Sequence, residues 1–320
     1  MLLVISGSFS AHMANSDGFV VVKKGKRRRP RPNRDCVSSS AKVFDCNESD
    51  HDIDFGRVKE KIHFYRDELK CSEFYTNVQE QLKQCYLTVY QERRKQDSEN
   101  RCDPDLDDVE RDVAGLSLND CPTNTTLPPD MECVCYGVGN ISGNIISQYQ
   151  LALVLALRED FKLNQDRCFM FDPVFTEGEK QTLQDLHFSI IPVNEEGKRR
   201  CHGPALFFLP HCGKALYNNL LWCNWHLQTL SNIVIIGNSF KAMVERTPQR
   251  LLKETGLYIM KIQEYTVEIP LSQTFHHSDI FNDMAIHYFP LHRLTSAPGE
   301  LWEAHDAPVY SQHDAEIILS

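Results

Sequence analysis

Apolar residues recur at helical spacing in one segment near the start of the chain. Val58, Ile62 and Leu69 fall on a single stripe, and the same period continues to Cys85. Residues 51–95 are therefore predicted to form two helices that pack as an appendage on the rest of the chain.

From about residue 131 onward, short apolar runs alternate with longer amphipathic segments. Four of the runs read ECVCY, RCFMF, ALFFL and NIVII. Apolar runs of this length between helices are typical of parallel strands that helices cover on both faces. The pattern predicts an α/β fold with a doubly wound, mostly parallel, Rossmann-like sheet over residues 131–295, in which residues 258–270 (YIMKIQEYTVEIP) form a further extended segment.

The segments outside this domain differ from it in composition. Residues 1–50 are polar and rich in Pro, Ser and Arg, which predicts a disordered basic tail. Residues 96–130 predict an acidic linker that contains prolines, and residues 296–320 a C-terminal tail. The chain is therefore interpreted as one large domain with attachments.

Charge is distributed unevenly along the chain. Residues 23–34 hold eight of the 34 Lys and Arg residues, and Asp17 is the only acid before residue 35. The remainder has 26 basic and 43 acidic side chains, which is a net charge of −17. A body this acidic disfavours binding to nucleic acid, except through the basic tail. That tail is open to three interpretations, a nuclear import signal, a loose RNA contact or a solvated arm, so the expected location is the cytoplasm with the nucleus as a second location.

The cysteines and the apolar runs argue against three kinds of protein. Several of the 12 cysteines, for example Cys133 and Cys135, lie in strand-like apolar runs. This placement favours buried, reduced thiols over a disulfide framework. The chain lacks the paired C-x₂₋₄-C motifs of structural zinc, so no metal site is predicted. No run of 18 apolar residues occurs, and no membrane partner is expected.

Glycines follow the first predicted strand in the stretch CYGVGNISGN. Gly137 and Gly139 would let the chain turn sharply and let a ligand approach the backbone, and Ser142 offers a hydroxyl at the same place. The dinucleotide-binding fingerprint has its third glycine one position earlier and its acid about 20 residues on, whereas Asp172 follows Gly139 by 33 residues. The turn is compatible with a nucleotide site and also with a simple connection from strand to helix.

Polar residues also follow other predicted strands. Asp172, His211 and Asn238 each stand at the carboxyl end of a strand, where open α/β sheets bind their ligands. Asn218 lies near the start of a predicted helix, within reach of the same edge. Together with the glycine turn and Ser142, these residues form the predicted site for a small-molecule ligand.

No catalytic residue is assigned from the sequence. Cys212 beside His211 invites interpretation as a nucleophile, but no oxyanion turn or third partner accompanies it. Asp283 and His287 are four residues apart, which on a helical turn would bring an acid–base pair together. A structural hydrogen bond is the favoured interpretation of that pair.

Several blocks of the sequence resemble one known family. The blocks CYGVGNISGNIISQYQLALVLAL, FDPVFTEGEKQTL, NEEGKRR, LPHCGKALYNNLLWCNW and FNDMAIHYF occur in this order. They are similar to the SRR-like family, which is named for sensitivity to red light reduced. The resemblance covers about residues 131–290 and departs from the family at Gly213, where many relatives are expected to have proline.

The resemblance implies a regulatory protein that acts on circadian clock gene expression and haem biosynthesis, with protein partners that the sequence does not identify. It implies no established enzymatic activity and transfers no catalytic residue. The alternative is a methyltransferase that depends on S-adenosylmethionine, or another nucleotide-binding enzyme. In that case Gly137 and Gly139 would cradle the cofactor and Asp172 would hold its ribose. Haem is the other cofactor considered, with Cys212 or Cys201 as a thiolate ligand.

Overall fold

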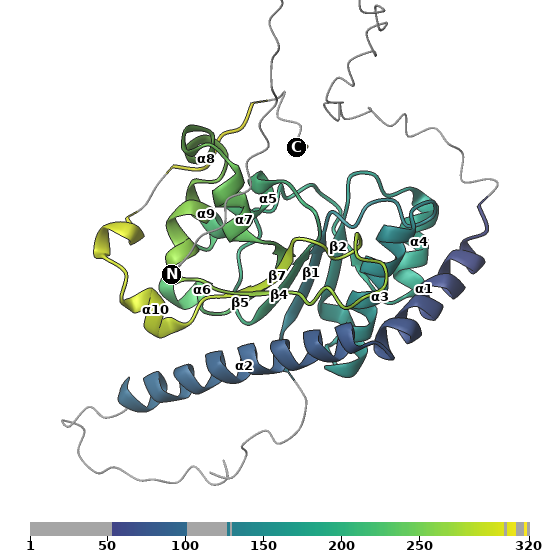
Figure 1. Ribbon diagram of the computed structural model, residues 1–320, viewed down its shortest axis with the longest axis horizontal. Helices are drawn as coiled ribbons and strands as arrows, with labels where there is room; N and C mark the ends of the chain where they lie inside the picture. The colour runs from purple at the N-terminus through teal and green to yellow at the C-terminus, as the bar shows by residue number, and fades with distance from the viewer. Residues whose placement is uncertain (1–52, 101–126, 129, 304–305, 312–316, 319–320) are drawn as a thin grey trace, which may run out of the picture. The chain divides into compact units, whose positions relative to one another are not determined.

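A seven-stranded mixed sheet lies at the centre of the described structure (Figure 1), in the order β3-β2-β1-β4-β5-β7-β6. Its strands are β1 (Glu132–Tyr136), β2 (Cys168–Phe171), β3 (Ser189–Ile190), β4 (Ala205–Leu209), β5 (Ile233–Asn238), β6 (Val267–Pro270) and β7 (Met284–Tyr288). The first five strands run parallel to one another, and β7 is antiparallel to both of its neighbours, β5 and β6. The predicted α/β class with a mostly parallel sheet is confirmed.

Helices account for most of the remaining described chain. They are α1 (Phe55–Lys70), α2 (Glu73–Asn100), α3 (Ile145–Asp160), α4 (Glu177–Asp185), α5 (Lys214–Cys223), α6 (Leu227–Leu230), α7 (Phe240–Arg246), α8 (Gln249–Thr255), α9 (Leu257–Ile262) and α10 (Leu291–Thr295), with 3₁₀ turns η2 (Gln165–Arg167), η3 (Gln263–Tyr265) and η4 (Gly299–Trp302).

The computed structural model describes residues 53–100, 127–128, 130–303, 306–311 and 317–318. All of these residues belong to one compact unit. The predicted basic tail and residues 101–126 of the predicted acidic linker lie outside the described residues.

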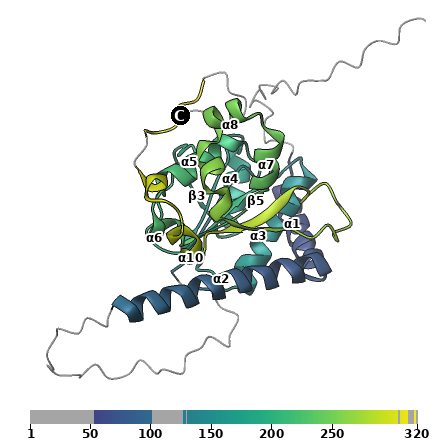
Figure 2. The same cartoon turned by 60° about the vertical axis from the view of Figure 1, so that its left-hand side comes forward.

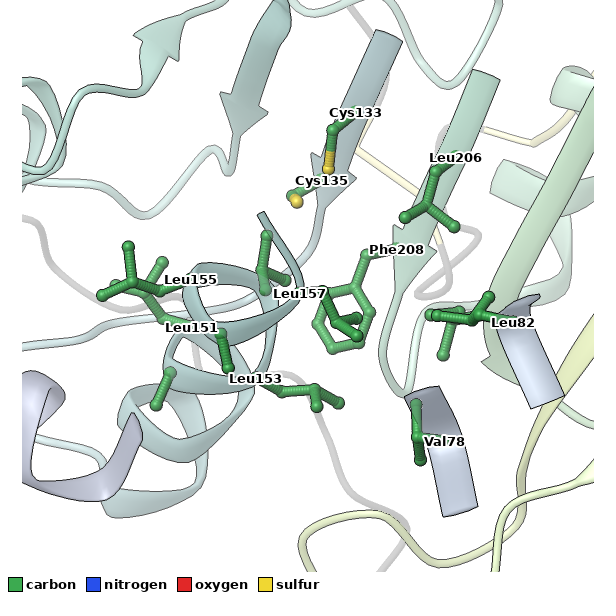
Figure 3. Packing of buried hydrophobic residues seen from close by; sticks show 14 of the residues in the cluster. Val78, Leu82, Cys133, Cys135, Leu151, Leu153, Leu155, Leu157, Leu206 and Phe208 are labelled. Carbon is green, nitrogen blue, oxygen red and sulfur yellow. The ribbon is translucent and has the colours of Figure 1, made fainter. Parts of the chain in front are cut away.

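The two faces of the sheet are covered by different helices. Successive side chains of a strand point to opposite faces, so neighbouring residues of β1 and β4 enter different hydrophobic clusters. Cys133 and Phe208 face one cluster, to which α1, α2 and α3 contribute (Figure 3). Val134 and Phe207 face the other, with α5 and α9. Because both sides of these strands are buried, each strand is a continuous apolar run, as the sequence shows.

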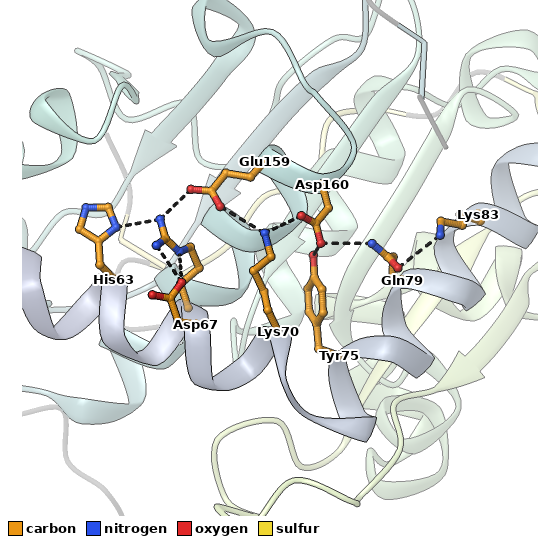
Figure 4. Close-up of polar contacts among 9 residues, drawn as sticks. His63, Asp67, Lys70, Tyr75, Gln79, Lys83, Glu159 and Asp160 are labelled. Atoms are coloured by element: carbon orange, nitrogen blue, oxygen red, sulfur yellow. Dashed lines mark hydrogen bonds and ion pairs between the residues drawn. The ribbon is translucent and has the colours of Figure 1, made fainter. Parts of the chain in front are cut away.

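Helix α1 packs on the outer side of α3, and α2 lies against β7 and α10. Ile62 and Leu69 of α1 are fully buried and belong to the same cluster as one face of the sheet. Polar contacts join the surfaces around them (Figure 4): Arg66 Nη1 lies 2.8 Å from Glu159 Oε1, and Lys70 Nζ lies 2.5 Å from Asp160 Oδ1. These two helices therefore share the hydrophobic core of the sheet.

The far end of α2 reaches α10, as the turned view in Figure 2 shows. Glu92 Oε2 accepts a hydrogen bond of 2.7 Å from the backbone N–H of Leu291, and the other oxygen pairs with His292. The segment before the sheet is thereby tied to the segment after it.

Two sequence-based predictions about the later part of the chain need correction. Residues 258–270 were expected to be extended, but α9 and η3 occupy residues 257–265 and only Val267–Pro270 is strand. The reason is that Tyr258, Ile259 and Ile262 are buried at helical spacing against α5. The segment FNDMAIHYF contains strand β7, so Asp283 and His287 do not share a helical turn.

Candidate functional site

A cavity of about 730 Å³ opens at the carboxyl ends of the parallel strands. The ends of β1, β2 and β5 contribute Tyr136, Phe171 and Asn238, and the loop after β4 contributes His211 and Cys212. The first residues of α5 and one side of α7 complete the wall. The strand ends that the sequence predicted to converge therefore do meet around one hollow.

The glycine turn after β1 is held tightly by the protein itself. Gly137 and Gly139 have φ values of +69° and +80°, a region that favours glycine. A Cβ on Gly137 would lie 2.4 Å from Cys212 Sγ, so the side chain is excluded by close packing as well. Gly137 lines the cavity, whereas Gly139 and Ser142 are not among the lining residues. The backbone N–H of Ser142 donates instead to Glu179 Oε1, 2.8 Å away.

Asp172 joins this turn to the end of β2. Its Oδ2 accepts a hydrogen bond of 2.7 Å from Gly139 N–H, and its Oδ1 accepts one of 3.0 Å from Val174 N–H. Burial raises the pKa of the Asp172 carboxyl, while these two backbone donors act in the opposite direction. Asp172 lines the cavity, but both of its oxygens already bind the protein backbone.

Asn238 fixes the loop after β4 from the neighbouring strand end. Its Oδ1 accepts from the backbone N–H of His211 at 2.8 Å, and its Nδ2 donates to the backbone oxygen of Cys212 at 2.9 Å. His211 has φ +51° and its Nε2 lies 3.0 Å from Ile280 O. The amide of Asn238 thus holds the backbone of this loop, and the exposed imidazole stands at the cavity wall.

Asn218 lies on the buried side of α5, away from the cavity. It is 1% exposed, and its Oδ1 accepts from Tyr258 N–H at 2.7 Å while its Nδ2 donates to Tyr310 Oη at 2.8 Å. It does not line the cavity. Its position explains why a polar residue occurs on the buried side of α5: it joins α5 to α9 and to the C-terminal segment.

The thiols near the site are not activated. Burial and, second, the nearby charge of Asp172 raise the pKa of Cys212 well above its usual range. Burial raises the pKa of Cys201 to about 12. The eight cysteines among the described residues are all unpaired. At neutral pH both thiols are protonated, which suits neither a nucleophile nor a ready thiolate ligand.

Asp283 and His287 have separate partners. Asp283 forms an ion pair with Arg246 at the cavity rim, with Nη1 2.7 Å from Oδ2. His287 is fully buried, with Nε2 3.4 Å from Glu268 Oε2. Asp283 and His287 therefore form neither the acid–base pair nor the favoured structural hydrogen bond, because Asp283 lies just before strand β7, His287 lies within it, and their partners differ.

Several wall residues were missed from the sequence. Lys214 and Arg246 line the cavity, at the start of α5 and the end of α7. Ile317 and Ile318 reach it from the C-terminal segment, where Asn194 Nδ2 donates to Ile318 O at 2.7 Å. Lys214 could have been found from its place at a predicted helix start after a strand, but no local signal places Ile317 there.

Within the described part of the chain, no three His, Cys, Asp or Glu side chains come together as a group that could hold a metal ion. Among the helices that the structure describes, none has both the length and the apolar character needed to cross a bilayer.

Comparisons with known proteins agree on one family. A family model described as the SRR1 domain matches residues 79–288. The SRR1-like protein of Mus musculus is 33% identical over 248 residues, which cover 76% of this chain and 90% of that protein. The SRR1-like protein of Drosophila melanogaster is 34% identical over 185 residues, covering 58% of this chain and 64% of that protein.

A plant protein is also similar. Protein sensitivity to red light reduced 1 of Arabidopsis thaliana is 29% identical over 239 residues, covering 73% of this chain and 76% of that protein. No solved structure matches the chain. The resemblance seen in the sequence blocks is confirmed, and because the family model matches more than half of its residues, the chain belongs to the SRR1 domain family.

Proposed function

We propose that this protein is a regulatory protein that binds a small polar molecule in the cavity at the carboxyl edge of its sheet. The observation that carries the proposal is the convergence of the ends of β1, β2 and β5 and the loop after β4 on one hollow of about 730 Å³. Hollows of this size at this edge are the usual ligand sites of α/β proteins.

The strand order supports this location. We propose that the sheet is doubly wound in the Rossmann manner, since β2 and β3 follow β1 on one side, β4 and β5 follow on the other, and helices cover both faces. In such sheets the ligand crevice opens where the order reverses, here between β1 and β4. Gly137 after β1 and Cys212 after β4 both line the cavity.

The expected ligand carries an anionic group. Helix α5 begins at the cavity wall with Gly213 as its N-cap, so the positive end of its helix dipole faces the hollow. Lys214 adds a positive charge beside this end. Asn282 and Ser239 also line the cavity, although the Ser239 hydroxyl already donates to Glu268 Oε1 and accepts from Ala242 N–H.

The side chains favour binding over catalysis. Asp172 and Asn238 use their polar atoms to hold backbone turns, and the Cys212 thiol is protonated. For the alternative, a methyltransferase that depends on S-adenosylmethionine, Gly139 and Asp172 would have to be free for the cofactor, but they bind each other. Haem also fits poorly, because its thiolate ligand would have to come from Cys212 or Cys201, whose pKa values are raised.

Thermal unfolding tests the proposal directly. Purified protein is heated with S-adenosylmethionine, with adenine nucleotides and with haem, and a ligand that binds the folded state raises Tm by mass action. We expect an anionic ligand to raise Tm, and Ala242→Phe, which fills the cavity from α7, to abolish the shift. Lys253→Ala, on exposed α8, is the control that should keep it.

Two outcomes contradict the proposal. If no ligand of these classes changes Tm, the protein acts as an adaptor without a ligand in this cavity. If S-adenosylmethionine raises Tm and Asp172→Asn removes that shift while Tm without ligand is unchanged, the methyltransferase alternative gains support.

We further propose that the regulated processes are circadian clock gene expression and haem biosynthesis, as the family resemblance implies. A plant relative bears the name sensitivity to red light reduced 1. The test is to deplete the protein from cells and to follow clock transcripts and haem content, with restoration by the wild type and by Ala242→Phe. Unchanged transcripts and haem content after depletion would refute this assignment.

We also propose that the protein is present in the cytoplasm and the nucleus and that residues 23–34 act as the import signal. The eight Lys and Arg residues of this segment support it. A fluorescent fusion should lose its nuclear fraction when these residues are replaced by a neutral sequence of equal length. An unchanged nuclear fraction would leave the segment as a solvated arm.

A further inference from the structure

A second cavity, of about 560 Å³, lies at the opposite edge of the sheet from the first. Residues 200–202 line it just before β4 begins, and Thr229 lines it just before β5. The carboxyl end of α5 and the turn after it form another wall. The two cavities share no lining residue, so a ligand here would bind independently of the site proposed above.

All three tryptophans of the chain line this cavity. Trp222 comes from the end of α5, Trp225 from the turn after it, and Trp302 from η4, about 80 residues later in the chain. The ring centroids of Trp225 and Trp302 are 5.7 Å apart with an interplanar angle of 43°, and Trp225 lies edge-on to Tyr258 at 4.7 Å.

The indoles are held in place but not covered. Trp225 Nε1 donates a hydrogen bond of 2.8 Å to Leu301 O, which fixes the indole of the turn after α5 against η4. Trp222, Trp225 and Trp302 are each only half-buried, so part of each ring remains open to solvent. Three half-exposed tryptophans around one hollow form a surface on which a planar ring can stack.

The charges of the wall are unusual for so acidic a protein. Arg200, His202 and His226 line the cavity, and no Asp or Glu is among the lining residues. Arg200 is exposed and, over the described residues, forms no ion pair. A cage for a quaternary ammonium group would be expected to avoid a nearby guanidinium, because like charges repel. The wall therefore favours an anion over a cation.

We propose that this cavity binds a planar aromatic anion, with its ring on the indoles of Trp222, Trp225 and Trp302 and its phosphate or carboxylate group at the Arg200 guanidinium. Aromatic stacking and an ion pair to arginine are the two means by which proteins bind nucleotides without reading the base. A nucleoside monophosphate has both groups and a size that suits a cavity of this volume.

Intrinsic fluorescence reports on this site because every tryptophan of the chain lines it. The full chain is titrated with AMP, and we expect saturable quenching of its tryptophan fluorescence, confirmed by calorimetry. Adenosine, which lacks the anion, and inorganic phosphate, which lacks the ring, should each bind at least tenfold more weakly than AMP. A titration with 2-naphthoate distinguishes an aromatic carboxylate from a nucleotide as the preferred ligand, and either preference supports the proposal.

Variants assign the binding to this cavity. Arg200→Gln changes an exposed residue and should weaken AMP binding at least tenfold without changing Tm. Trp302→Ala should also weaken AMP binding at least tenfold, because it removes one of the rings on which the ligand stacks. Arg250→Gln, on exposed α8, is the matched control and should bind as the wild type does.

Two results overturn the proposal. One is the absence of saturable quenching and of calorimetric binding with both AMP and 2-naphthoate. The other is AMP binding that Arg200→Gln leaves unchanged. If Ala242→Phe abolishes that binding, the ligand occupies the first cavity. That last outcome would support the proposed function and refute the second site, so the two failures are distinguishable.

Discussion

At the scale of single residues, Gly137 shows how tightly the first cavity depends on one missing side chain. Its φ of +69° strains any residue with a Cβ, and that Cβ would also lie 2.4 Å from Cys212 Sγ. We expect Gly137→Ala to lower the free energy of unfolding by about 2 kcal/mol or more, measured by urea denaturation. Gly299→Ala is the control, since its added Cβ meets nothing within 4 Å and should change stability by less than about 0.5 kcal/mol. Equal effects of the two substitutions would show that the turn is not packed as described.

Glu268 is expected to make stability depend on acidic pH. Burial alone would raise its pKa, but hydrogen bonds from His287 and Ser239 outweigh burial and lower the pKa of Glu268 to about 2. A carboxyl with a lowered pKa in the folded state stabilises the protein above its unfolded pKa of about 4.5, and this contribution is lost as pH falls toward 2. Urea denaturation at a series of pH values should therefore show a smaller loss between pH 4.5 and 2 for Glu268→Gln than for the wild type. An identical pH profile for both proteins would contradict the assignment.

Sequence reasoning at this scale found residues but not their hydrogen bonds. Asp172, His211 and Asn238 were predicted from their positions after strands, and all three line the cavity. The sequence does not show that Asp172 binds Gly139 N–H or that Asn238 holds the loop after β4, because those bonds depend on how neighbouring strands are placed. Asn218 was predicted near the site, but its amide binds Tyr258 N–H and Tyr310 Oη, contacts that depend on how α9 and the C-terminal segment pack against α5.

At the scale of elements, a buried aromatic contact holds α2 to the segment just before β7. Phe74, at the start of α2, is fully buried and stacks on Phe281 with ring centroids 4.7 Å apart. We expect Phe74→Ala to cost about 3–5 kcal/mol of unfolding free energy, measured by urea denaturation. Phe64→Ala on α1 removes a ring that is 64% exposed and should cost less than about 0.5 kcal/mol. A small effect of Phe74→Ala would mean that α2 is not part of the cooperative core.

The C-terminal segment is expected to control access to the first cavity. Ile317 is 8% exposed and packs against Ala215 and Tyr310 beside the cavity wall. Ile317→Asp should release this contact and lower the free energy needed to expose Cys212. Since each 1.4 kcal/mol of that free energy is a factor of ten, we expect alkylation of Cys212 to accelerate about tenfold or more. Pulsed alkylation with mass spectrometry of the peptide that contains Cys212 measures the rate. Ile318→Asp, at a position that is 60% exposed, should leave the alkylation rate of Cys212 near that of the wild type. A similar acceleration in both variants would argue against the contact of Ile317.

Element types were predictable where the periodicity was unambiguous. The helical stripe in α1 and the box formed by Thr176 and Glu179 at the start of α4 are both present in the structure. The segment from residue 258 was misassigned because the period of a short apolar run alone does not separate helix from strand. Residues 284–288 are all buried, which removes the alternation that identifies a strand.

At the scale of the whole molecule, the strand order was beyond what the sequence determines. The alternation of strands and helices predicted a mostly parallel sheet, which is confirmed, but the antiparallel insertion of β7 between β5 and β6 depends on pairing between residues about 50 apart. The second cavity was missed for a related reason. Trp302 lies in a segment predicted as a tail, and only the fold places it beside Trp225.

The extent of the folding unit leads to a prediction about where the chain can be shortened. The family model begins at residue 79, within α2, yet the residues before it include the fully buried Ile62, Leu69 and Phe74. Each such side chain contributes about 1.5–3 kcal/mol when buried, and the whole stability of a domain is about 5–15 kcal/mol. A chain that begins at residue 79 should therefore unfold at a much lower urea concentration than one that begins at residue 53, or fail to fold. If both chains showed the same midpoint and the same slope of the transition, α1 would be an independent attachment and the contacts of Arg66 and Lys70 with α3 would contribute nothing to the stability of the sheet.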